Sequence, residues 1–238
     1  MKFFRCYATP RSGHRSVMLW IVYQHSSIRE FVPLYIDWKN GPKRVQKPAV
    51  LNIDNYKAVL FNHCSNRAKP DITPDLDTDR LILGYENNVT PSSISYNFNI
   101  PYTNIIILRD IFNTMASVKK FRLFAGRKNK QSYKYPRYIM DGWLSCAKAI
   151  KNNEGYFINY NLYNHDPHYR QQLCRDLGLF FTDIGIDEVP KPGSSFTRMD
   201  KPDRKMLNQR YKMVDIGPIE EEYPEHVELS NKIFGKLE

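Results

Sequence analysis

The sequence predicts an α/β fold with three layers, in which helices cover both faces of a central, mainly parallel sheet. Apolar segments of strand length alternate along the chain with longer segments of helical periodicity. The strand segments are apolar almost throughout, which is typical of strands that are buried on both faces. A turn that carries an arginine follows two of these strands, and ligands of such sheets bind beyond the carboxyl ends of the strands.

β-Branched and aromatic residues predict strands at 2–8, 57–63, 104–109 and 156–160, and less strongly at 80–85. Helical periodicity predicts helices at 15–25, 112–124, 138–152, 168–177 and 224–234. Terminating signals support several of these helices, because Asn153-Glu154-Gly155 ends one helix, Asp166-Pro167 begins the next and Gly178 ends it. The segments 40–47 and 65–79 are rich in Pro, Asp, Asn and Lys, so we expect surface loops there.

The chain length and composition indicate one globular domain over 1–238. A chain of 238 residues can bury one good core, and 42% hydrophobic with 25% charged residues is ordinary for a folded protein. The formal net charge of +10 favours an anionic partner. Charge alone does not choose among a nucleotide, a nucleic acid, a membrane surface and an acidic glycan.

The cysteines give no sign of a metal site. Cys6, Cys64, Cys146 and Cys174 are scattered and form no CxxC pair, so we expect reduced, mostly buried thiols and no bound metal. The N-terminus lacks the features of a signal peptide, and no apolar run reaches the length of a membrane span. The resulting expectation is a soluble, cytoplasmic protein.

The first arginine-bearing turn is Thr9-Pro10-Arg11-Ser12-Gly13-His14-Arg15-Ser16, directly after the first strand. A strand, a glycine turn and a helix together direct free backbone N–H groups and the positive end of the helix dipole toward one point. The sequence contains no GxxxxGK[ST] run, which disfavours an ordinary ATP or GTP loop. The turn predicts an anion site, although a helix start with a surface arginine would also explain it.

The second turn follows the strand 104–109. Arg109 ends that strand, and Ser117 lies eight positions later on the following helix. Arginine offers a fork of donors to phosphate oxygens, and serine adds a short donor. Two such turns suggest a ligand whose phosphates are at separate positions. The alternative is an Arg109 that pairs with Asp110 and a serine that the helix merely tolerates.

The two turns resemble motifs of the sulfotransferases that use 3′-phosphoadenosine-5′-phosphosulfate (PAPS). Pro10-Arg11-Ser12-Gly13 is similar to the 5′-phosphosulfate loop of that family, which reads PKSG or PRSG. Arg109 and Ser117 have the spacing of the family's pair that holds the 3′-phosphate. The resemblance implies that PAPS is bound by Arg11, Ser12, Gly13, His14, Arg15 and Ser16 at one end, and by Arg109 and Ser117 at the other.

Two later segments agree with the resemblance in their order. Tyr160-Asn161-Leu162, followed by Asp166-Pro167, is similar to the family's YEDL…DP segment, which implies that Tyr160 lies near the adenine. Gly193-Ser194-Ser195-Phe196 resembles the (T/S)SF motif, which implies that Phe196 stacks on the base and that Ser194 is a polar contact. A core role for Phe196 is the alternative, because buried aromatic residues are common.

The resemblance also implies a general base. His63 ends an apolar strand, where many sulfotransferases place a catalytic histidine in KTH or KSH. A histidine titrates near neutral pH and can take the proton of an attacking hydroxyl or amine. A structural or surface role is the alternative for His63, and Glu86 is the second candidate base because some family members use a carboxylate.

Two departures from the family pattern concern the phosphate contacts. His14-Arg15-Ser16 stands where hydroxyl residues often follow the loop glycine, so Arg15 and Ser16 are expected to replace some of those contacts, and a donor that is held differently is the alternative. The family's RKG run, which contacts the 3′-phosphate, has no clean match; the nearest basic runs are Arg204-Lys205 and Arg210-Tyr211-Lys212. Neither run is assigned as a ligand from the sequence.

The predicted function is transfer of the sulfuryl group from PAPS to a hydroxyl or amine, with 3′,5′-ADP as product, His63 as base and Arg11 as an electrostatic catalyst. The expected acceptor is a small molecule or glycan, anionic ones included, with no specific nucleic acid and no metal. One alternative is a nucleotide or small-molecule kinase with a degenerate phosphate loop. Another is a non-catalytic polyanion-binding protein, suggested by the net charge and the basic, tyrosine-containing segment Arg127–Arg137.

Overall fold

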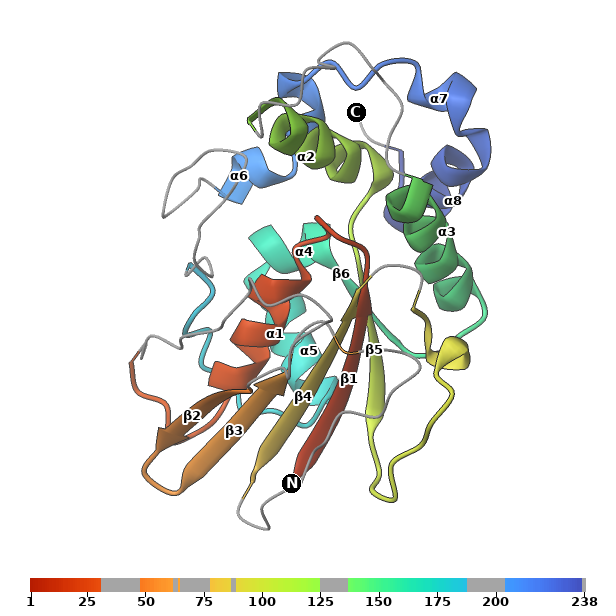
Figure 1. Ribbon diagram of the computed structural model, residues 1–238. Coiled ribbons are helices and arrows are strands. Elements are labelled where there is room, and N and C mark those ends of the chain that lie inside the picture. The colour runs from red at the N-terminus through yellow and green to blue at the C-terminus, as the bar shows by residue number, and fades with distance from the viewer. Residues whose placement is uncertain are drawn as a thin grey trace.

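A six-stranded sheet forms the centre of the protein (Figure 1). The computed structural model describes residues 1–30, 48–61, 64, 78–86, 89–124, 137–187 and 204–236. The strand order is β2-β3-β4-β1-β5-β6. The strands are β1 (Lys2–Ala8), β2 (Ala49–Ile53), β3 (Tyr56–Phe61), β4 (Arg80–Glu86), β5 (Thr103–Leu108) and β6 (Tyr156–Asn159). Every neighbouring pair is parallel except β2 with β3, so the predicted, mainly parallel sheet is confirmed.

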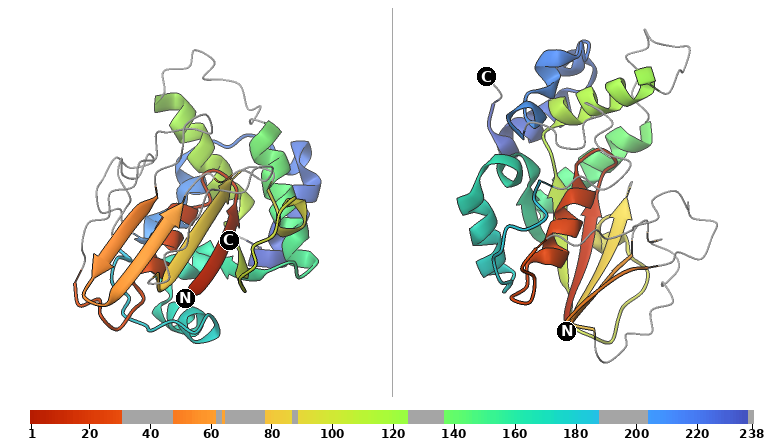
Figure 2. Two further views of the ribbon diagram at one scale, coloured as in Figure 1. Left: turned by 60° about the horizontal axis from the view of Figure 1, so that its bottom comes forward. Right: turned by 90° about the vertical axis from the view of Figure 1, so that its left-hand side faces the viewer.

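Helices cover both faces of this sheet, as Figures 1 and 2 show. One face carries α1 (His14–Tyr23), α4 (Tyr160–His165) and α5 (Pro167–Asp176), and the other carries α3 (Arg137–Lys151). Near the carboxyl ends of the strands lie α2 (Ile111–Phe124), α6 (Arg204–Leu207), α7 (Ile219–Glu222) and α8 (Pro224–Phe234). Two short 3₁₀ helices, η1 (Pro91–Ser93) and η2 (Arg210–Met213), complete the described elements.

The alternation of side chains along β5 builds two separate cores. Ile105 and Ile107 pack against α1, α4 and α5, whereas Ile106 and Leu108 pack against α2, α3 and α8. All four side chains are fully buried, which explains why this strand is apolar throughout. The three-layer α/β class predicted from the sequence is therefore confirmed.

On the face opposite α1, the sheet carries a third cluster of apolar and aromatic side chains. Phe3 and Tyr7 of β1 belong to it, and they pack with Leu83 and Tyr85 of β4. The cover over this face comes from the segment 94–102, whose even-numbered residues from Ile94 to Tyr102 pack against the cluster. This part of the sheet is thus covered by extended chain and not by a helix.

Polar contacts at the end of α1 fix the direction in which that helix points. Arg80 is almost fully buried and donates to the carbonyl oxygens of Ile21 and Gln24, the latter at 3.1 Å. The Tyr56 hydroxyl donates to the carbonyl of Val22 at 2.6 Å. Since the last carbonyls of a helix have no partner within it, these donors stabilise the carboxyl end of α1. Its amino end then lies at the carboxyl ends of the strands.

The structure differs from the predicted elements at several boundaries. Tyr160 begins α4 instead of ending a strand, because the Asn159 side chain accepts from the backbone of Asn161 and Leu162 and caps the helix. β2 was not predicted; it pairs with β3 across a turn that contains Asp54 at a φ of 48°. The predicted loops 40–47 and 65–77 lie outside the described residues. No described helix combines the length and apolarity required to cross a bilayer.

Candidate anion-binding site

Both arginine-bearing turns leave the sheet at the same edge. β1 and β5 are adjacent and parallel, and Ala8 pairs in register with Ile107. The two strands therefore end side by side, and each continues directly into one of the turns. Adjacent parallel strands lie about 4.8 Å apart, so the beginnings of the turns are close neighbours.

The first turn has an unusual backbone conformation. Arg11 and Gly13 both have positive φ angles, 75° and 85°. The Ser12 hydroxyl donates to the carbonyl of Thr9 at 2.8 Å and is buried, so this side chain closes the turn. A Cβ atom at Gly13 would overlap the ring of Tyr160, so the position requires glycine for both its conformation and its lack of a side chain.

The amino end of α1 lies at the carboxyl ends of the strands. Gly13 is its N-cap, and no side chain of the described residues caps the helix. The backbone N–H of Ser12 is bonded to Thr9 and that of Ser16 to Gly13, at 3.3 and 3.0 Å. Within the described part of the chain, the N–H groups of Gly13 and His14 make no backbone hydrogen bond. These two donors, with the helix dipole behind them, are suited to an anion.

Arg109 in the second turn is a buried cation whose donors are only partly used. Its side chain is 1% exposed, and Nε and Nη2 hydrogen-bond to no described residue. Asp110 does not neutralise it through an ion pair; its carboxylate instead accepts from the backbone N–H and the side-chain amide of Asn113, at 2.8 and 2.9 Å. Because a buried donor without an acceptor is costly, this guanidinium is arranged for an anionic ligand that the protein itself does not provide.

Arg210 is a further cation at this site, and the sequence did not assign it. It comes from η2, is buried, and its Nη1 lies 3.5 Å from Ser117 Oγ on α2. Ser117 is itself buried, eight residues after Arg109. The only sequence signal was the basic run Arg210-Tyr211-Lys212, which could not reveal a contact between residues 93 positions apart.

The ring of Tyr160 lies between the two turns. It approaches Gly13 on one side, and the guanidinium carbon of Arg109 lies 5.5 Å from its centroid. The ring also stacks against Tyr163 at 5.7 Å and is 6% exposed. One aromatic side chain thus connects the glycine turn to the buried arginine, so the two turns form a single site.

Burial and mutual repulsion lower the pKa values of the arginines. Burial, followed by the charges of Arg109 and Arg11, lowers the pKa of Arg210 to about 9. Burial, followed by the charge of Arg15, lowers the pKa of Arg11 to about 10. Burial also lowers the pKa of Arg109. Positive charge is therefore concentrated at the strand ends, and an anion with several negative charges would relieve the repulsion.

Glu86 provides the negative charge beside the first turn. It is the last residue of β4. Its Oε1 lies 2.8 Å from His14 Nε2 and 3.7 Å from Arg15 Nη2. Neither ring nitrogen of His14 makes an aligned hydrogen bond within the described residues, so its contact with Glu86 is a close electrostatic approach. A carboxylate and an imidazole thus lie directly beside the glycine turn.

Part of the predicted site lies outside the described residues. This holds for His63, Ser194 and Phe196, and for the side chains of Arg204 and Lys205. Of the remaining predicted ligands, the structure gathers Arg11, Gly13 and His14 of the first turn with Arg109, Ser117 and Tyr160. Arg15 and Ser16 lie on the first turn of α1, both partly exposed.

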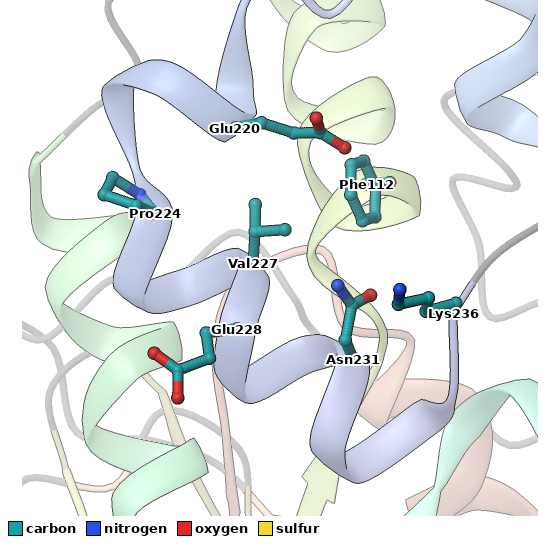
Figure 3. Close-up of a pocket in the computed structure, with 7 residues that line it drawn as sticks. All are labelled: Phe112, Glu220, Pro224, Val227, Glu228, Asn231 and Lys236. Carbon is teal, nitrogen blue, oxygen red and sulfur yellow. The ribbon is translucent and has the colours of Figure 1, made fainter.

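A separate pocket of about 490 Å³ lies between the first turn of α2, α7 and α8. Its walls include Phe112, Val227, Asn231 and Glu220, and Figure 3 shows the Glu220 carboxylate directed toward the Phe112 ring. None of the arginines at the strand ends lines this pocket. Buried charge whose donors have no partner among the described residues marks the strand ends, and not this pocket, as the candidate site.

The three-dimensional structure is similar to that of a known enzyme domain. The sulfotransferase domain of the Synechococcus PCC 7002 olefin synthase matches with a TM-score of 0.51 and 12% identity, over 100% of this chain and 95% of that domain. The fold is sulfotransferase-like. The sulfotransferase domain of the curacin biosynthetic pathway matches at a TM-score of 0.44, with 12% identity and coverage of 100% and 98%. No protein-family model matches the sequence, and no curated protein does.

Proposed function

We propose that this protein is a sulfotransferase that takes the sulfuryl group of PAPS and transfers it to a hydroxyl or amine. The observation that carries the proposal is the buried Arg109, two of whose nitrogens have no hydrogen-bond partner among the described residues. Its charge acts on Arg210, whose Nη1 lies 3.5 Å from Ser117 Oγ. A 3′-phosphate distinguishes PAPS from ATP, and this constellation is suited to that group. The sulfotransferase-like fold supports the same reading.

The proposed binding mode assigns one end of the nucleotide to each turn. Gly13 and His14 would donate their backbone N–H groups to the 5′-phosphosulfate, and Arg11 would neutralise it. Arg109, Ser117 and Arg210 would hold the 3′-phosphate through charge-assisted hydrogen bonds. In this mode Tyr160, which contacts both turns, would lie beside the adenosine. Ser194 and Phe196, which lie outside the described residues, remain proposed contacts of the adenine ring.

The donor supplies a sulfuryl group that is already activated by its phosphate leaving group. In the transfer, the acceptor oxygen or nitrogen bonds to sulfur while the bridging oxygen leaves with its electron pair on 3′,5′-ADP. Arg11 would stabilise the negative charge on the departing phosphate, but as a guanidinium it would not protonate it. The remaining work of the protein is to align the reactants and exclude water.

A base must remove the proton of the acceptor. His63 is the proposed base on the family resemblance, and Glu86 is the second candidate because of its place beside the first turn. Arg15 Nη2 lies 3.7 Å from the Glu86 carboxylate, and a nearby cation weakens a carboxylate as a base. This favours His63 over Glu86.

Thermal unfolding with a panel of ligands tests the donor class. The panel contains 3′,5′-ADP, 5′-AMP, ATP with Mg²⁺, and heparin as a polyanion. We expect 3′,5′-ADP at one hundred times its Kd to stabilise the protein by about 2.7 kcal/mol, which is a rise in Tm of about 5–10 °C for a chain of this size. A shift with ATP and Mg²⁺ alone would indicate a kinase. Equal shifts with every anion would indicate a polyanion-binding protein.

A further inference from the structure

Arg210 belongs to a segment that has little stability of its own. It begins η2, a four-residue 3₁₀ helix, and it follows α6, which is also four residues long. Helices this short are not stable in isolation. The charges of Arg109 and Arg11 moreover repel the Arg210 side chain. Contacts elsewhere in this segment therefore help to hold the arginine in place.

Asn113 on the first turn of α2 makes such contacts on both sides of Arg210. Its side-chain amide donates to the carbonyl oxygen of Asn208 at 2.9 Å, and its Oδ1 accepts from the backbone N–H of Tyr211 at 3.4 Å. Asn113 is fully buried. The residues two before and one after Arg210 are thus tied to the helix that carries Ser117.

The orientation of the Asn113 amide is fixed by its neighbours. The NH₂ group faces the Asp110 carboxylate and the Asn208 carbonyl, both of which only accept hydrogen bonds. The oxygen faces an N–H donor. An aspartate of the same shape would direct an oxygen at two acceptors, so this site requires the amide and not merely its volume.

Asn208 ties the same segment to a second helix. Its Nδ2 donates to the carbonyl of Asn161 at 2.9 Å, and its Oδ1 accepts from Asn164 Nδ2 at 3.2 Å. Both partners belong to α4, the helix that begins with Tyr160. The segment that carries Arg210 is therefore held between the helix of Ser117 and the helix of Tyr160, two residues that line the candidate site.

We propose that Asn113 and Asn208 are positioning residues that hold Arg210 against Ser117 and so determine the preference for a 3′-phosphate. This inference rests on the proposed function. Neither asparagine needs to touch the nucleotide. Both act through the arginine, which they keep at the site against the repulsion of Arg109 and Arg11.

Calorimetric Kd values of 3′,5′-ADP and 5′-AMP test this assignment, because their ratio reports the 3′-phosphate alone. Asn113→Asp and Asn208→Ala should each reduce the preference for 3′,5′-ADP about three- to tenfold, while 5′-AMP binding is retained. Arg210→Met should reduce the preference at least as much. In the Arg210→Met background, Asn113→Asp should cause no further change, because its effect passes through that arginine.

Thr114→Val is the matched control. Thr114 lies on the same turn of α2, and its hydroxyl donates to the Asp110 carbonyl at 2.8 Å. The variant therefore removes a neighbouring hydrogen bond and leaves the contacts of Asn113 with Asn208 and Tyr211 in place. The preference of Thr114→Val for 3′,5′-ADP over 5′-AMP should equal that of the wild type. Asn208→Ala decides the matter if Asn113→Asp does not fold, since Asn208 is only half-buried.

Two results would overturn the inference. One is that both asparagine variants keep the wild-type preference for 3′,5′-ADP over 5′-AMP. The other is that Asn113→Asp reduces this preference by the same factor in the wild-type protein and in the Arg210→Met background. A wild-type protein that binds 3′,5′-ADP no better than 5′-AMP would instead refute the proposed function, and the inference with it.

Discussion

Replacing Arg109 by methionine should stabilise the ligand-free protein and weaken its binding of 3′-phosphorylated nucleotides. Methionine fills much of the volume of the arginine side chain but carries no donor. The substitution therefore removes the buried nitrogens that have no partner among the described residues. It also removes one of the guanidinium groups that repel Arg210. A residue kept only for the stability of the core would show the opposite effect.

The expected magnitude follows from the contacts of Arg109. Its two nitrogens that have no partner among the described residues each cost about 1–3 kcal/mol. Loss of the cation–π contact with Tyr160, at 5.5 Å, offsets about 0.5–2 kcal/mol of this gain. At the midpoints of these ranges we expect a net gain of about 3 kcal/mol in the free energy of unfolding, or a rise in Tm of several degrees. Loss of charge-assisted hydrogen bonds worth about 1.5–3 kcal/mol should weaken 3′,5′-ADP binding about ten- to hundredfold.

Urea unfolding of the ligand-free protein measures the first effect, and calorimetric titration with 3′,5′-ADP and 5′-AMP measures the second. Arg109→Lys is the control, because lysine keeps the charge but loses the planar fork. Its affinity for 3′,5′-ADP should fall between those of the wild type and Arg109→Met. The reasoning is refuted if Arg109→Met destabilises the ligand-free protein by about 2 kcal/mol or more, as a lost core contact would. It is refuted equally if the affinities for both nucleotides fall by the same factor.

Three further predictions test other parts of the structure. Gly13→Ala should destabilise the protein by about 2–5 kcal/mol in urea unfolding, because the new Cβ would overlap the Tyr160 ring and the φ angle is positive. Gly235→Ala is the control. Its φ is 80° with open space around it, so it should show only the smaller cost of the backbone conformation. His63→Ala should reduce the rate of sulfuryl transfer by about 10²–10⁴-fold without loss of nucleotide affinity, whereas Glu86→Gln should change that rate little. A large loss with Glu86→Gln and a small one with His63→Ala would assign the base to Glu86. Burial lowers the pKa of His226, so as the pH falls below about 6.5 the unfolded chain takes up a proton that the folded chain does not, and stability decreases. His226→Gln should flatten the dependence of unfolding free energy on pH between 7 and 5 by up to about 1.4 kcal/mol per pH unit, and an unchanged slope would exclude this histidine.

The parts of the fold that the sequence predicts best are those determined by local pattern. The sequence predicts β1 and β5 as strands because aromatic and β-branched residues dominate them, and α8 as a helix because of its helical periodicity and its initial proline. β2 carries no comparable signal. It is a short edge strand whose pairing with β3 depends on register, with Leu51 opposite Ala58. Tertiary pairing and not propensity creates this strand.

The same distinction applies to the candidate site. Arg11, Arg109 and Ser117 are recognisable because each lies at a fixed place relative to a strand end, and the topology of the sheet then brings the two turns together. Arg210 lies far along the chain on a four-residue helix, and its place depends on contacts with Asn113 and Asn208 that no local pattern encodes. The pairing of Asp110 with Asn113 likewise excludes the simple ion pair with Arg109 that adjacency suggests.

The adjacency of β1 and β5 has a consequence for which molecules the protein can select. Since each strand continues into one of the two turns, the distance between the beginnings of the turns is set by the spacing of a hydrogen-bonded sheet, about 4.8 Å. A loop can lengthen or shorten in evolution, but that spacing cannot. Under the proposed function, we therefore expect diversification of this protein to change the acceptor before it changes the nucleotide donor.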